Sequence, residues 1–173
     1  MEKKAKRNIL IILFFIIIMC KIAITPASRG NIERRFNKNM TDIFLIVDYI
    51  IDLDYDSVSI YSPIDGDVDN QIIFAGSRYG DIPIDKDEVV DVLKRLQNNK
   101  FSTIIKKNNV IWFSCWSTMD KSRGIVYSID GNIPDNLSLQ FLIRIEELTE
   151  PNWYYYEQDF NEFKKRDTMG ISE

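Results

Sequence analysis

The chain has 173 residues, of which 22 are Lys or Arg, 26 are Asp or Glu, two are Cys and none is His. This length suits one hydrophobic core, and an apolar fraction of 45% is typical of a folded protein. The lack of histidine excludes a Ser-His-Asp triad, a Cys-His pair and a His-ligated zinc site. Because Cys20 lies in an apolar leader, Cys115 has no intrachain disulfide partner. We therefore predict no metal site and no cofactor.

The first 24 residues have the pattern of an export signal or a membrane anchor. Four basic residues within 1–8 precede an unbroken apolar run over 9–20, which Lys21 separates from three more apolar residues. In such segments the basic end stays in the cytoplasm. The leader is either cleaved after Thr25-Pro26-Ala27, retained as an anchor over 9–24, or lipidated at Cys20, although Met19 is too large for the usual lipidation motif. Each alternative predicts a domain outside the cytoplasm, either at the cell membrane or secreted.

We divide the chain into a leader at 1–27, one extracytoplasmic α+β domain at 28–160 and a charged tail at 161–173. Removing the leader leaves 17 basic and 25 acidic residues, which is a net charge of −8. A negative domain repels phosphate backbones and anionic lipid headgroups. We therefore predict no nucleic-acid partner, and membrane contact only through 9–24 if the leader is uncleaved.

Two segments in the N-terminal half have helical periodicity. Apolar residues recur at steps of three and four over 31–51, which predicts a helix with one buried face. A second helix is expected after Asp85, which forms a capping box with Glu88, and it ends at Asn98-Asn99.

The remaining apolar segments are short and favour strands. We expect strands at 57–61, 71–75, 101–106, 110–116, 124–129, 141–148 and 153–158, although 139–148 could also be helical. The tail from Asn161 is expected to fray. These elements predict an α+β fold, in which two N-terminal-half helices pack on one face of an antiparallel sheet of about five to seven strands.

The acidic residues form two weak patterns. Asp65, Asp67 and Asp69 match positions 1, 3 and 5 of a calcium loop, but Gly76 stands where the loop requires a bidentate Glu. An acidic turn is therefore favoured, and weak calcium binding stays open. Several carboxylates between Glu146 and Asp159 could support glycosidase-type chemistry, but no pair among them is distinguished by the sequence.

Aromatic residues form the most distinctive concentration. If 110–116 is a regular strand, Trp112 and Trp116 share one face and Phe113 lies on the opposite one. Trp153 and Tyr155 fall on a neighbouring strand. An exposed aromatic face would be a docking surface, because Trp and Tyr bury large areas at little entropic cost. The partner-binding prediction therefore comprises Trp112, Trp116, Trp153 and Tyr155, and the alternative is that these rings are core residues.

These patterns favour a non-enzymatic domain that binds another protein, in the manner of an inhibitor or an immunity factor. The alternative is a small-ligand or glycan-binding module that uses the same aromatic face. A carboxylate-based hydrolase is a third hypothesis, and the sequence contains no catalytic signature that supports it.

Overall fold

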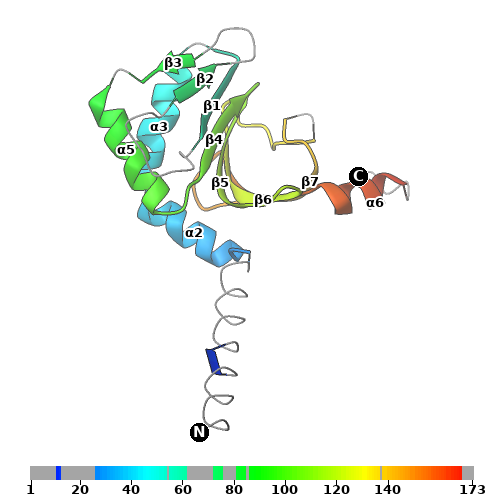
Figure 1. Ribbon diagram of the computed structural model, residues 1–173. Helices are drawn as coiled ribbons and strands as arrows, with labels where there is room; N and C mark the ends of the chain where they lie inside the picture. Colours follow the sequence, from blue (N-terminus) through cyan, green and yellow to red (C-terminus); the bar gives the residue numbers. More distant parts are fainter. Residues whose placement is uncertain are drawn as a thin grey trace, which may run out of the picture.

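The computed structural model describes residues 11–12, 26–53, 55–61, 72–75, 81–84, 86–136 and 138–168. Helices pack against an antiparallel sheet, which confirms the predicted α+β fold (Figure 1). Within these residues no helix is both long and apolar enough to span a membrane. Of the predicted anchor at 9–24, only Ile11 and Ile12 are described. The three aspartates of the calcium hypothesis lie outside the described residues.

The described residues form a sheet of eight strands in the order β3-β2-β1-β4-β5-β6-β8-β7, with antiparallel pairing throughout. Each predicted strand segment overlaps one of them, and 139–148 contains a strand rather than a helix. The predicted range of five to seven strands is too low because a short strand at 81–83 was missed. The strands are β1 Ser57–Tyr61, β2 Ile72–Ala75, β3 Asp81–Pro83, β4 Thr103–Lys107, β5 Val110–Ser117, β6 Lys121–Ser128, β7 Leu142–Glu147 and β8 Trp153–Asp159.

The predicted helix at 31–51 is two helices, α2 Arg29–Lys38 and α3 Met40–Asp52. Between them Asn39 leaves the helical conformation, with φ −113° and ψ 17°. Its side-chain amide donates to the carbonyl of Arg35 at 2.7 Å, which satisfies an acceptor at the end of α2. The apolar periodicity continues through this break, and the sequence pattern therefore does not reveal it.

Helix α5 spans Asp87–Asn98, close to the predicted bounds, but its N-cap is Lys86 and makes no side-chain capping bond. Asp85 lies outside the described residues. The prediction of a frayed tail from Asn161 is wrong over 161–168, because these residues belong to helix α6, Phe160–Thr168, and 169–173 lie outside the described residues. Asp159 caps this helix, since its Oδ1 accepts from the backbone amides of Asn161 and Glu162 at 3.0 and 3.1 Å.

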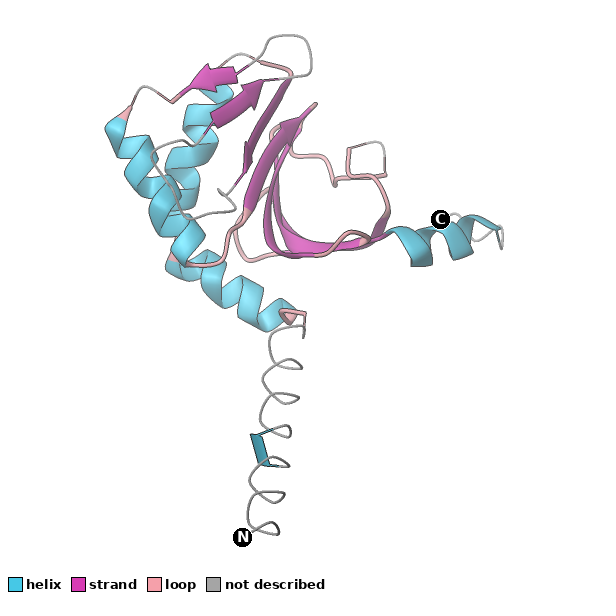
Figure 2. Ribbon diagram, in the orientation of Figure 1, coloured by secondary structure: helices cyan, strands magenta, loops and turns pink. Residues whose placement is uncertain are grey.

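The main core lies between the sheet and helices α2, α3 and α5, which cover one side of the sheet in Figure 2. We call this side the helix face. Trp153 is its centre and is 1% exposed. Four aromatic rings surround its indole at centroid distances of 4.8 to 5.9 Å, and they belong to Phe36, Phe44, Phe113 and Tyr127.

The other side of the sheet, which we call the open face, has a smaller apolar cluster. Its buried members are Val110, Val126, Leu139, Tyr154 and Tyr156, and Trp112 packs against them. Leu139 belongs to the segment between β6 and β7, which crosses over this side of the sheet.

Candidate functional site

A groove of about 560 Å³ lies on the open face of the sheet. Trp112 of β5 and Ile105 of β4 sit directly opposite each other in the sheet and form its apolar floor. The β5–β6 turn, the segment before β7 and the start of α6 form its walls. The wall residues are Thr118, Met119, Asp120, Lys121, Ser122, Ser138, Gln140, Phe141, Gln158 and Phe160, and Lys107 of β4 completes the lining.

Three large apolar side chains at this groove face solvent. Met119 is fully exposed, and Phe141 and Phe160 are 37% and 41% exposed. The rings of Phe141 and Phe160 meet edge to face with centroids 4.9 Å apart. Met119 belongs to the turn that joins β5 and β6, so the two walls bring apolar groups from distant parts of the chain to one site.

Phe141 also has an unusual backbone conformation. Its φ is +59°, in the left-handed region that bulky side chains rarely adopt. Such a conformation costs on the order of 1–3 kcal/mol and persists only where surrounding contacts enforce it. Here the amide of Asp159 donates to the Phe141 carbonyl at 3.0 Å, and the ring also contacts Phe163 at 5.8 Å. The fold therefore holds Phe141 at the groove despite its strain.

Several polar side chains of the groove are engaged within the protein. Gln158 donates to the carbonyl of Gln140 at 2.7 Å, and Lys121 forms a 2.6 Å ion pair with Asp159. Burial opposes ionisation of Asp159, but Lys121 and the α6 amides lower the pKa of its carboxyl overall. Lys107 is the cationic lining group that forms no ion pair within the described part of the chain.

A triangle of hydroxyls lies under one end of the groove. Tyr156, Ser114 and Ser122 are within 3.1 to 3.2 Å of one another, and Ser122 lines the groove. Burial raises the pKa of the Tyr156 phenol well above its usual range, even though both serines stabilise the charged form. The phenol therefore remains protonated at neutral pH and is a poor general base.

The four aromatic residues predicted to bind a partner do not lie together. Only Trp112 lines the groove. Trp153 and Tyr155 are each 1% exposed and belong to the helix-face core, so they are not part of an accessible surface. The buried alternative applies to these two rings because α2 packs against β8 on the helix face, although β8 is only one strand in from the β7 edge.

Trp116 is not on the same face as Trp112, because the strand is irregular between them. The pairing of β5 with β6 shifts between Ser114 and Trp116, which places Trp116 opposite Arg123. Arg123 lies two residues from Ile125 and shares its helix-face side. The guanidinium of Arg123 stands over the Trp116 ring at 5.9 Å. A β-bulge therefore moves Trp116 to the opposite side of the sheet.

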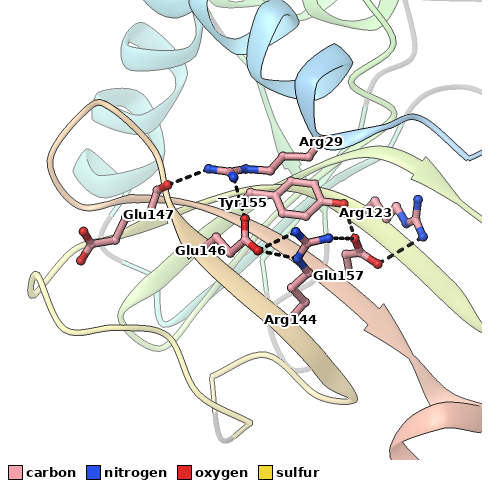
Figure 3. Close-up of polar contacts among 7 residues, drawn as sticks. All are labelled: Arg29, Arg123, Arg144, Glu146, Glu147, Tyr155 and Glu157. Carbon is pink, nitrogen blue, oxygen red and sulfur yellow. Dashed lines mark hydrogen bonds and ion pairs between the residues drawn. The ribbon is translucent and has the colours of Figure 1, made fainter.

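Beside Trp116 the helix face ends in a network of charges that Figure 3 shows. Glu157 accepts from Tyr155 at 2.6 Å and pairs with Arg123 at 3.1 Å and with Arg144 at 3.2 Å. Arg144 also pairs with Glu146 at 2.6 Å, and Arg29 reaches the same carboxylate at 2.8 Å. Every carboxylate in this network is held between arginines, which is the arrangement of a structural network rather than of an acid-base pair.

The sequence interpretation missed Met119, Phe141 and Phe160. Met119 and Phe160 are isolated apolar residues, and Phe141 begins the apolar run before β7, so only the fold brings the three to one groove. Within the described residues no group of three or more Cys, Asp or Glu side chains is arranged to hold a metal ion. Searches with protein-family models, among curated proteins and among solved structures each found no match to this chain.

Proposed function

We propose that this chain is a non-enzymatic protein-binding domain, and that the Trp112 groove receives an apolar segment of another protein. The observation that carries this proposal is the set of exposed apolar side chains at the groove, Met119, Phe141 and Phe160. Exposed apolar groups gathered around a concave site mark interaction surfaces, because their burial against a partner is favourable.

Protein binding is favoured over glycan binding by the chemistry of the walls. Sugar recognition requires polar groups that are free to bond hydroxyls beside the stacking ring. Here Gln158 is already bonded to the Gln140 carbonyl, and the hydroxyl of Ser122 is shared within the triangle. The apolar floor and the exposed side chains of Met119, Phe141 and Phe160 remain for a ligand, which suits leucine-like or aromatic side chains of a polypeptide.

Binding is also favoured over hydrolysis. Asp120 is the one carboxylate among the described residues that line the groove. Carboxylate-based glycoside hydrolysis requires two such groups on opposite sides of the scissile bond. The groove therefore supports recognition better than catalysis. The basic, apolar leader supports placing this recognition outside the cytoplasm, on a membrane-anchored or secreted protein.

Site-specific photo-crosslinking tests the proposal. The full chain with a benzophenone amino acid at Met119 is exposed to membrane and secreted fractions of the source cells, and crosslinked peptides are identified by mass spectrometry. We expect one protein to crosslink at Met119, and its yield to fall at least tenfold when Phe160→Ala is added. The matched control carries the same probe at Ile133, which is 62% exposed but does not line the groove.

A partner that crosslinks equally from Met119 and Ile133 would contradict docking at the groove. Binding of polysaccharide in place of protein, lost in Trp112→Ala with the fold intact by circular dichroism, would favour the glycan alternative. Tryptophan fluorescence gives an independent readout, because a bound segment should change the emission of the native chain and not that of Trp112→Phe.

A further inference from the structure

Strand β7 forms one edge of the sheet and has β8 as its only neighbour among the described strands. In an antiparallel pair, alternate residues of an edge strand direct their N–H and C=O groups outward. The amide of Leu148 bonds to Trp153 of β8, which identifies 144, 146 and 148 as the inward set. The outward groups therefore belong to Ile145 and Glu147. The pairing with β8 shifts between Leu142 and Arg144, so the outward direction of the Ile143 carbonyl is inferred from its contact with Arg166 instead.

Two arginines reach this outward edge. Arg166 of α6 donates to the carbonyl of Ile143 at 3.2 Å, and Arg29 of α2 donates to the carbonyl of Glu147 at 3.3 Å. Ile145, midway between them, has no such partner in the described part of the chain. A groove of about 670 Å³ lies along the same edge, between β7, α6 and the segment at 134–136. The edge therefore has unpaired backbone groups and space beside it.

The sequence of this edge is complementary to itself. If β7 pairs antiparallel with β7 of a second copy around a two-fold axis at Ile145, Arg144 lies opposite Glu146 of the second copy. The two-fold axis repeats this Arg–Glu contact, so it occurs twice in the dimer. Opposite charges that lie directly across from each other stabilise the pairing of two strands. The same register sets Ile143 opposite Glu147 of the second copy.

The arginines are compatible with this pairing. A backbone carbonyl has two lone pairs, so Ile143 and Glu147 can each keep their arginine and accept an inter-strand N–H. The carboxylate of Glu147 points away from the charge network in Figure 3, and no ion pair with another described residue holds it. In the dimer this carboxylate arrives beside Arg166 of the other copy, because Arg166 lies at Ile143. We propose that the chain forms a two-fold dimer by pairing of its β7 edges, centred on Ile145.

Cysteine crosslinking tests the register of this pairing. The full chain carries Cys20→Ser, so that Cys115, which is buried, is the remaining native thiol. In a hydrogen-bonded antiparallel pair the two Ile145 Cα atoms are about 5.5 Å apart, within the range of about 4.4–6.8 Å for a disulfide. We expect Ile145→Cys to give mainly disulfide-linked dimer on mild oxidation in detergent micelles.

Glu147→Cys is the matched control. Its Cα atom lies about 14 Å from its own symmetry mate, four residues along the strand, so we expect no homodimer from it. A mixture of Ile143→Cys with Glu147→Cys should instead give the mixed disulfide. Equal crosslinking of Ile145→Cys and Glu147→Cys would overturn the proposal, because it would show contact without this register or through the leader alone.

A charge reversal gives a second measurement that requires no cysteine. Arg144→Glu sets Glu opposite Glu146 of the second copy, and we expect at least a tenfold rise in the dimer dissociation constant by sedimentation equilibrium. Arg123→Glu breaks a pair with the same Glu157 but lies away from the edge, and should leave dimerisation unchanged. A monomer at all concentrations for the native chain would overturn the proposal. Trp112→Ala changes the groove floor on β5, three strands away from the β7 edge, so the two proposals can fail separately.

Discussion

Gly124 of β6 offers a sharp test of how the sheet is packed at the bulge. A Cβ atom added there would lie 1.9 Å from the carbonyl oxygen of Phe113 and 3.1 Å from the ring of Tyr156. The first contact is with backbone and falls about 1.5 Å short of ordinary van der Waals contact, so it cannot be relieved by rotating a side chain. Strand β5 would have to shift at the position where its pairing with β6 changes register.

We therefore expect Gly124→Ala to lower the free energy of unfolding by about 3 kcal/mol, at the upper end of the usual cost of overpacking a core. Urea unfolding followed by tryptophan fluorescence measures this change from the shift in midpoint. Gly30→Ala is the control, since nothing lies within 4 Å of its added Cβ in α2. Alanine is the better helix former by roughly 0.8–1 kcal/mol, so this variant should be neutral or more stable. A Gly124→Ala protein within about 0.5 kcal/mol of the native chain would refute this account of the bulge.

Other groups give further predictions. The folded-state pKa of Asp159 is lowered, so its stabilisation is complete above the unfolded value of about 3.9 and is lost as the pH falls through the folded value. Native protein should therefore lose thermal stability between about pH 5 and 3 more steeply than Asp159→Asn, and equal slopes would contradict the role of Lys121 and α6. Burial raises the pKa of the Cys115 thiol to about 12, although Arg35 opposes this shift. In Cys20→Ser protein at pH 8, Cys115 should resist iodoacetamide until the chain is unfolded in urea, and rapid alkylation of folded protein would contradict its burial. Tyr156→Phe should cost only about 1 kcal/mol in urea unfolding, because Ser114 and Ser122 remain 3.2 Å apart and can bond each other. A much larger loss would show that the triangle acts as a cooperative unit.

The fold class and most strand positions could be predicted because they follow from local patterns. The short apolar segment over 110–116 and the turn at Lys107-Asn108-Asn109 predicted the β4–β5 hairpin, whose tip holds Asn108 at φ +55°. The break at Asn39 could not be predicted in this way, because the apolar stripe continues in phase on both sides of it. The short β3 has too few residues for any period to emerge.

The candidate site was predicted only in part. Trp112 was placed on a regular strand, and its face and partial exposure follow from alternation. The prediction failed for Trp116 because alternation assumes no extra residue, and a bulge of one residue reverses every later assignment. It failed for Trp153 because the sequence does not show that five aromatic rings from five elements converge on the helix face.

The bulge also explains why the two proposed surfaces are separate. Ser114, before the shift, stays on the open face and bonds Tyr156 beneath the groove. Trp116, after it, stands by Arg123 at the start of the charge network that extends through Glu157 and Arg144 to the β7 edge. A regular strand would set both tryptophans at the groove and leave Arg123 without an aromatic neighbour on this strand. Because of this one inserted residue, Trp112 lies at the groove on the open face, whereas Trp116 lies beside the charge network on the helix face.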